Sequence, residues 1–268
     1  MATDSNRKVR VRLLGTGTST GVPVLNCTCD VCTSTDHRDK RLRCAAFIEV
    51  AGVNLLIDIG PDFRQQAFRE QIGHIDSVLI THHHFDHVVG MDDLRPFIFH
   101  NRTPIPIFAE RTSADALRNM FGYIFRDGSY PGVPKLEMHD VRGPFAVQSR
   151  EDDSLSVKVI PIPVVHGSLD ILGYRIGNFA YLTDVSSIPN ASYALLEGLD
   201  ILVLDALRDR PHPMHLTIER AMEVAGRIGA SQTWFTHMSH EILHTDFLAR
   251  MPENMAPAYD GLVLEAGY

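Results

Sequence analysis

The chain has 268 residues, of which 44% are hydrophobic and 22% charged, a balance typical of a globular protein with a sizeable core. A formal net charge of −8 repels an extended nucleic acid, so nucleic acid is not the expected partner. The polar, basic start lacks the apolar segment of a secretory signal, and no window approaches a membrane span. We therefore expect a cytoplasmic protein and, because no repeat or linker divides the chain, a single domain over residues 1–268.

The N-terminal half predicts strands that alternate with helices. A strand over 9–14 ends in the small-residue turn GTGTSTGVP, and a β-hairpin follows over 44–60. Helical spacing over 62–73 has Asp62 as its N-cap and Gly73 as its stop. Further along the chain we expect a buried strand over 77–82, a strand over 104–110 and a helix over 113–125.

The C-terminal half repeats this alternation. A strand over 154–166 precedes a hairpin over 172–184, and these are followed by a strand over 200–207, an amphipathic helix over 217–229 and strands over 232–237 and 261–267. Mixed strands and helices with a hairpin in each half predict an α/β fold. Its two mixed sheets pack face to face, with helices outside, as a four-layer αββα sandwich.

A histidine-rich run, H-x-H-x-D-H, begins at the end of the buried strand over 77–82. Alternate side chains of an extended segment share a face, so His82 and His84 can reach one ion while His83 faces away. Asp86 and His87 follow where the chain turns, and they can address a second ion. Imidazole and carboxylate together suit zinc, manganese or iron.

The same ligand types end other apolar strands further along the chain, at His166, Asp184 and His237. Strand ends on one edge of a sheet converge in space, and functional residues favour such positions. The alternative for the histidine run is a solvated polar loop, which would not explain the additional ligands at later strand ends. The sequence therefore predicts a metal centre.

Three cysteines with the spacing C-x-C-x-x-C follow the small-residue turn, at Cys27, Cys29 and Cys32. In a cytoplasmic chain such a cluster indicates metal binding before a disulfide. A tetrahedral zinc site needs a fourth ligand, and His240 could complete a Cys3His site. Such a zinc would tie the N-terminal loop to the C-terminal part of the chain. The alternative is three reduced cysteines without a metal.

The histidine run, with NLLIDIG before it and YLTD and WFTH after it, resembles the metallo-β-lactamase superfamily over nearly the whole chain. The resemblance implies the metallo-β-lactamase form of the αββα sandwich and two divalent metal ions. It also implies that Asp58, in NLLIDIG, orients a ligand histidine from behind. The implied ligands form two sets and a bridge: His82, His84 and His166 for the first ion, Asp86, His87 and His237 for the second, and Asp184 between them.

The cysteine run narrows this resemblance. LLGTGTSTGVPVLNCTCDVC with THMSH downstream resembles the PhnP branch of cyclic-phosphate phosphodiesterases, in which three cysteines and a histidine hold a structural zinc. The tRNA 3′-processing endonucleases of the RNase Z type share the glycine-rich start and the seven ligands. The cofactor-biosynthesis protein PqqB also has an N-terminal cysteine cluster, but it is not known for an intact H-x-H-x-D-H run.

We therefore predict a dinuclear phosphodiesterase that hydrolyses small or cyclic nucleotide-like phosphodiesters through a hydroxide bridging two zinc or manganese ions. Asp86 belongs to this catalytic centre. The leaving alkoxide also needs a general acid. His215, in HLTIERA, resembles the catalytic histidine at a helix start in the phosphodiesterase branch. His212 is the reserve candidate, and a helix-capping or surface role is the alternative for His215.

Other classes of protein fit the sequence less well. An RNase Z-like RNA endonuclease would have a long basic arm, whereas RDGSYPGVPKLEMHDVRGP is short and only mildly basic. A thioesterase of the glyoxalase II type, or a β-lactamase, would not carry the cysteine cluster or HLTIERA. A non-catalytic metal-binding protein would lack ligands, and all seven are present. The expected partner is a small phosphodiester or nucleotide, and a homodimer is compatible with the sequence.

Overall fold

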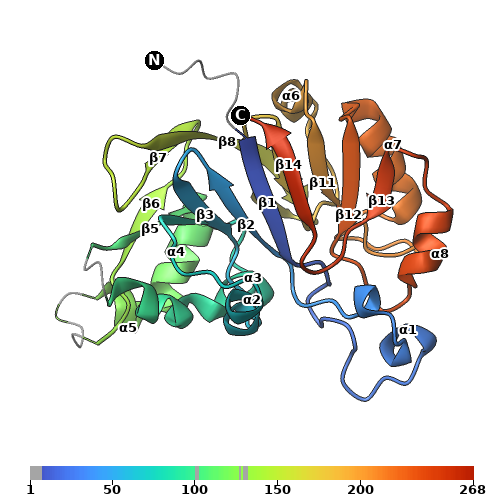
Figure 1. The fold of residues 1–268 in the computed structure, drawn as a ribbon, viewed down its shortest axis with the longest axis horizontal. Coiled ribbons are helices and arrows are strands. Elements are labelled where there is room, and N and C mark those ends of the chain that lie inside the picture. The colour runs from blue at the N-terminus through green and yellow to red at the C-terminus, as the bar shows by residue number, and fades with distance from the viewer. Residues whose placement is uncertain (1–7, 100–102, 127, 129–131) are drawn as a thin grey trace.

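The computed structural model describes residues 8–99, 103–126, 128 and 132–268 (Figure 1). Residues 1–7 of the polar, basic N-terminal segment lie outside this range. Residues 127 and 129–131, in the mid-chain stretch RDGSYPGVPKLEMHDVRGP, also lie outside it. Among the described residues, no helix combines the length and the hydrophobicity needed to cross a membrane.

The described residues form two seven-stranded mixed sheets with the same pattern of parallel and antiparallel pairing. In each sheet four strands pair antiparallel and the remaining strands continue in parallel. The first sheet has the order β14 (Val263–Gly267), β1 (Lys8–Gly15), β2 (Ala45–Val50), β3 (Val53–Ile57), β4 (Ser77–Leu79), β5 (Ile105–Ala109) and β6 (Leu136–Asp140). The second has the order β13 (Met255–Pro257), β12 (Gln232–Thr236), β11 (Ile201–Asp205), β10 (Phe179–Leu182), β9 (Leu169–Ile176), β8 (Ser156–His166) and β7 (Phe145–Gln148).

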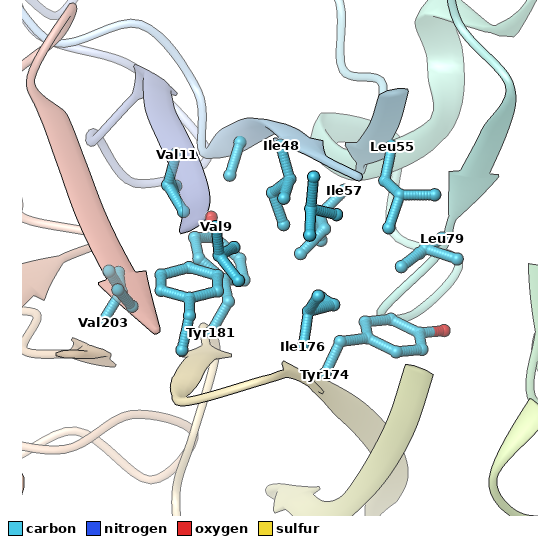
Figure 2. Close-up of a cluster of buried hydrophobic side chains, with 14 of the residues drawn as sticks. Val9, Val11, Ile48, Leu55, Ile57, Leu79, Tyr174, Ile176, Tyr181 and Val203 are labelled. Atoms are coloured by element: carbon cyan, nitrogen blue, oxygen red, sulfur yellow. The ribbon is translucent and has the colours of Figure 1, made fainter. Parts of the chain in front are cut away.

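The two sheets pack face to face through one apolar core (Figure 2). Strand alternation creates it: along β1, Val9 and Val11 point inward and are fully buried, while Lys8 and Arg10 point to solvent. Tyr181 of the second sheet packs into the same core. Each outer face is covered by helices over a separate core. The predicted αββα sandwich is therefore confirmed.

Helices and helical turns occupy both outer layers and the loops between them (Figure 1). On the first sheet lie α2 (Phe63–Arg69), α3 (Phe85–Val88), the 3-10 helix η3 (Val89–Ile98), α4 (Arg111–Met120) and α5 (Gly122–Phe125). On the second sheet lie α6 (Asn190–Tyr193), η4 (Ala194–Leu196), α7 (Ile218–Ile228) and α8 (His244–Ala249). The loop after β1 carries α1 (Asp30–Thr33) and η2 (His37–Asp39).

The helix predicted over 62–73 is shorter than expected. Asp62 occupies the N-cap position without a side-chain cap, because its carboxylate accepts hydrogen bonds from the Arg43 backbone N–H at 2.8 Å and from the Arg43 guanidinium at 2.9 Å. The helix ends at Arg69, and Gln71 has a φ of 53°, which bends the chain before Gly73. Ile72 then turns back into the core beneath the helix.

Candidate metal centre

The ends of strands from both sheets meet at one edge of the sandwich. His82 lies three residues beyond β4, His166 is the last residue of β8, Asp184 lies two residues beyond β10, and His237 directly follows β12. Two of these residues, Asp184 and His237, have positive φ angles of 59° and 60°. Non-glycine residues rarely adopt this conformation, and it tends to occur where a side chain must be aimed at a site.

Close backbone packing sets the position of α3, which carries the second half of the histidine run. The backbone N–H of Ile59 donates to the carbonyl of His87 at 2.7 Å. A Cβ at Gly60 would lie 2.0 Å from the carbonyl oxygen of Asp86, and one at Gly90 would lie 2.3 Å from the carbonyl oxygen of Gly60. Only glycine permits this approach, which holds Asp86 and His87 against the loop after β3.

All seven predicted ligands are brought together. In two groups the potential ligand atoms lie within 4.8 Å of one another, namely His82, His84 and His166, and Asp86, His87 and His237. These groups have the same members as the two sets that the resemblance implies. Most members are buried, but His84 is exposed, so the centre is open to solvent on its side. His83 instead points away, with Nδ1 3.1 Å from the hydroxyl of Ser113.

Asp184 lies between the two groups. Its Oδ1 is 3.2 Å from Nε2 of His237, and its Oδ2 is 3.2 Å from Nε2 of His87. Burial alone would raise the pKa of Asp184, yet the neighbouring imidazoles of His237 and His87 hold it well below its usual range. Both of these histidines belong to the second group, but Asp184 also lies within 4.8 Å of the ligand atoms of His82 and His166 in the first group. A carboxylate that approaches histidines of both groups has the geometry of a bridge.

The chemistry of these side chains fits divalent metal ions. Nε2 of His87 and Nε2 of His237 are buried without a hydrogen-bond partner among the described residues. Such unpartnered atoms are costly in a protein interior unless another group binds them. Nitrogen and carboxylate oxygen around a common space suit zinc, manganese or iron. The residues predicted as ligands therefore fit the ions they would hold.

Asp58 contacts His87 on the side of the ring that faces away from the centre. Its Oδ2 lies 2.7 Å from Nδ1 of His87, which leaves Nε2 of that ring facing the centre. The same carboxylate accepts hydrogen bonds from the backbone N–H and the hydroxyl of Thr81, each at 2.8 Å. Asp58 is fully buried, so these bonds fix both the carboxylate and the imidazole.

His215 lies at the edge of the centre. Its ring stacks on that of His237 with centroids 4.6 Å apart, and it lies 4.8 Å from the ring of His166. Nδ1 of His215 is 3.4 Å from Oδ1 of Asp205. Burial lowers the pKa of His215, but the carboxylates of Asp205, Asp184 and Asp86 together raise it above its ordinary value. This arrangement favours a proton on His215.

Asp205 has a larger role than the sequence indicated. Its Oδ1 lies 3.4 Å from Nδ1 of His237 as well, and its Oδ2 accepts the backbone N–H of Leu216 at 3.0 Å. One buried carboxylate therefore contacts the candidate general acid and a candidate ligand. Burial raises the pKa of Asp205 to about 6. The signal in the sequence was its place at the end of an apolar strand, which did not reveal its two partners.

The reserve candidate, His212, lies farther out. Its ring centroid is 5.0 Å from that of His215, and its Nδ1 accepts the backbone N–H of Met214. The carbonyl of Met214 faces Nδ1 of His166 at 2.9 Å, so this loop is fixed to the centre. The geometry places His215 closer to the candidate ligands than His212.

The three cysteines form a second cluster with His240. Nδ1 of His240 lies 3.3 Å from Sγ of Cys27, 3.5 Å from Sγ of Cys29 and 3.7 Å from Sγ of Cys32. All four cysteines of the chain are free thiols. A hydrogen bond from the Cys32 backbone and the neighbouring His240 lower the pKa of Cys29 to about 6, whereas burial raises the pKa of Cys32 to about 11. Four convergent soft ligands with no open position suit a structural zinc.

The fold and the site are those of a metal-dependent hydrolase. Residues 53–238 match the family described as the beta-lactamase superfamily domain, and the chain belongs to that superfamily. Within it, the chain resembles the PhnP branch. A crystal structure described as a new diphosphatase from the PhnP family is 42% identical, covers 96% of this chain and 97% of its own, and has a TM-score of 0.87. The predicted family is therefore confirmed.

Two other relatives show how far the likeness extends. A protein named octanoyltransferase from Porphyromonas gingivalis is 42% identical over 257 residues, which are 95% of this chain and 51% of the relative. The chain thus spans about half the length of that curated relative. The structure of zinc-bound PqqB from Methylobacterium extorquens is 20% identical, covers 95% of this chain and 99% of its own, has a TM-score of 0.71, and shows the shared fold.

Proposed function

We propose that the protein is a dinuclear phosphodiesterase that hydrolyses small or cyclic nucleotide-like phosphodiesters. The observation that carries this proposal is that Asp184 approaches ligand atoms of both groups, His82 and His166 in one and His87 and His237 in the other, with the His215–Asp205 pair at their edge. The likeness to a PhnP-family diphosphatase supports chemistry at a phosphoryl centre. The net charge of −8 favours a small substrate over a long nucleic acid.

Two divalent ions, zinc or manganese, would occupy the centre, and a structural zinc would occupy the cysteine cluster. The first active-site ion would be held by His82, His84 and His166, the second by Asp86, His87 and His237, with Asp184 shared. When bound, such ions lower the pKa of water and stabilise the charge that develops on a phosphoryl group. Asp58 keeps His87 aimed at the centre with Nε2 free.

His215 is the proposed general acid. The Asp205 carboxylate holds Nδ1, so the other ring nitrogen, Nε2, is the atom that would donate its proton to the leaving alkoxide. The stacked ring of His237 and the hydrogen bond that the Leu216 backbone N–H donates to Asp205 limit the movement of this pair. Proton donation matters most for esters with poor leaving groups, since a nitrophenolate leaves without assistance.

Thioester hydrolysis is the second candidate function. The observation that favours it is the name of the octanoyltransferase relative, although that protein is about twice as long as the aligned segment. Homodimer formation and the lack of nucleic-acid binding are further predictions.

A substrate panel tests the proposal. Metal-free protein is reconstituted with zinc or manganese and assayed on bis(4-nitrophenyl) phosphate, a 2′,3′-cyclic nucleotide, an octanoyl thioester and a precursor tRNA. We expect metal-dependent hydrolysis of the diester and the cyclic nucleotide. Hydrolysis of the thioester alone would establish the second candidate instead, and cleavage of the tRNA alone would indicate an RNA endonuclease.

A further inference from the structure

An exposed aromatic side chain lies within the histidine run itself. Phe85 stands between the candidate ligands His84 and Asp86, and it is 66% exposed. Consecutive Cα atoms are about 3.8 Å apart, so the backbone of Phe85 is one residue step from a ligand on either side. Single exposed apolar side chains are ordinary at a protein surface. This one, however, lies where exposed His84 opens the centre to solvent.

The short helix α3 determines which way Phe85 faces. Successive residues of a helix are turned by about 100° from one another. Asp86 contributes to the metal centre, and Val88 is buried in the core beneath the outer helices. The face of Phe85 therefore lies between the face that meets the centre and the face that meets the core, and it is turned toward solvent beside the ligands.

A row of exposed side chains continues from Phe85 along the same face. The backbone N–H of Val89 donates to the carbonyl of Phe85, so these two side chains lie one helical turn apart on one face. Asp92 follows Val89 by three residues in the 3-10 helix η3, where such side chains eclipse. Its Oδ1 accepts the hydroxyl of Tyr123 at 3.1 Å, which places α5 at the end of the row. Phe85, Val89 and Tyr123 are all exposed and form an apolar face that begins at the metal centre.

We propose that this face binds the nucleobase of a nucleotide substrate, with the base stacked on the ring of Phe85. This inference rests on the proposed function, because it needs a phosphoryl group held at the metal centre. With the phosphate among the ligands, the base is the part of the nucleotide that extends past His84 to the apolar face. Every base has a π-face that stacks on an aromatic ring, whatever its hydrogen-bonding groups. Phe85 therefore favours phosphates that carry a planar group, without selecting one base.

The test compares two phosphates that differ by one base. AMP and ribose 5-phosphate are titrated calorimetrically into the metal-loaded full chain, and the ratio of their dissociation constants is measured for wild type and Phe85→Ala. We expect wild type to prefer AMP and Phe85→Ala to reduce that preference about tenfold, the size of one lost base–aromatic stack. Phe85→Tyr should keep the preference, whereas Phe85→Leu should lose most of it, because leucine has no π-face. Both ligands carry the same phosphate, so a disturbed metal centre would weaken both and would not imitate a lost stack.

Phe68→Ala is the matched control. Phe68, on α2, is 70% exposed, and its ring centroid lies 4.9 Å from Cζ of Arg64. It lines a pocket with Phe97 and His74, and none of the candidate metal ligands lines that pocket in the described part of the chain. An unchanged ratio in Phe85→Ala, or an equal loss in Phe68→Ala, would overturn the inference.

Two further measurements separate this inference from its alternatives. Sedimentation of Phe85→Ala is compared with that of wild type, and a changed oligomeric state with an unchanged ratio would assign the face to a second copy of the chain and overturn the inference. Hydrolysis of bis(4-nitrophenyl) phosphate by wild type is recorded separately. Its absence would contradict the proposed function, whereas the affinity ratio alone decides the role of Phe85.

Discussion

The two candidate metal clusters share one loop but are built in different ways. His237 and His240 lie three residues apart after β12, and each contributes to a different cluster. The histidine–aspartate cluster collects strand ends from both sheets and keeps exposed His84 on its open side. The cysteine cluster collects one short loop and a single distant histidine, and its four ligands leave no open position.

We infer from this difference that the first cluster serves catalysis and the second serves stability. The first cluster has supporting carboxylates behind its ligands, Asp58 at His87 and Asp205 at His237, which fix ring orientation where geometry limits the rate. The second secures the loop after β1 to the loop after β12. Beside it, the buried guanidinium of Arg41 donates to the carbonyls of Ser239 and Ile242 at 3.0 and 2.8 Å.

The largest effect is expected from the residue between the two ligand groups. Asp184→Asn removes the negative charge that both groups share, so hydrolysis of bis(4-nitrophenyl) phosphate should fall by more than about 100-fold, beyond the usual loss for a supporting residue. Activity against added metal is the measurement. Asp170→Asn, an exposed position on β9, is the control and should retain activity. Full activity of Asp184→Asn would show that the two ligand groups do not depend on a shared Asp184 carboxylate.

His215→Ala should give the next largest effect, and it should depend on the leaving group. A cyclic or alkyl diester should lose about 100-fold or more in kcat, while a nitrophenyl ester should lose much less because its leaving group needs no proton. Rates on both esters are compared in the metal-loaded protein. His212→Ala should cost less than His215→Ala on the alkyl ester, and the opposite order would exchange their roles.

Asp58→Asn tests whether the Asp58 carboxylate is needed to orient His87 in the histidine–aspartate cluster. Losing the charge that orients His87 should weaken metal binding or activity by about 10- to 100-fold. Titration of the metal-free variant with zinc measures this shift. Because the ligands themselves remain, excess metal should restore part of the activity. A variant that binds metal like wild type would show that His87 is held without its carboxylate.

Cys29→Ser removes one thiol of the cysteine cluster. Loss of the structural zinc should lower the free energy of unfolding by about 3 kcal/mol, a fall of about 6 to 12 °C in Tm for a domain of this size. Thermal unfolding measures the change, and Asp30→Asn, an exposed neighbour on α1, is the control. An unaltered Tm in Cys29→Ser would mean that the cysteines do not stabilise the fold.

The smallest effect concerns acid stability near the cysteine cluster. Burial, with the charges of Arg38 and Arg41, lowers the pKa of His244 from 6.5 to about 4, against the opposing carboxylates of Asp36 and Asp39. A depressed folded-state pKa gives stability that is present above pH 6.5 and is lost as pH falls toward 4. His244→Asn should therefore remove about 1 to 2 kcal/mol of the stability difference between pH 7 and pH 4. Urea unfolding at both values checks this, and an unchanged difference would assign acid sensitivity to other groups.

The αββα fold followed from the alternation of strands and helices in the sequence. The candidate metal centre could be predicted because His82, His166, Asp184 and His237 stand at or just beyond apolar strands, while His84, Asp86 and His87 complete the run that begins at His82. Features that depend on packing between distant segments could not be predicted in this way. Asp205 meets both His215 and His237 only because β11 pairs with β12. The edge strands β6, β7 and β13 were not predicted, since the first two are only partly buried and the third has three residues and ends in Pro257.

The number of metal ions per chain distinguishes a catalytic pair of ions from a separate structural zinc. Elemental analysis is made on wild type, Asp184→Asn and Cys29→Ser after equilibration with zinc and removal of the excess. We expect three ions per chain in wild type. Asp184→Asn should hold fewer ions but retain the cysteine-bound one, and Cys29→Ser should hold two because both active-site ions are retained. A single ion in wild type, or the same loss in both variants, would contradict the division into a catalytic pair and a separate structural zinc.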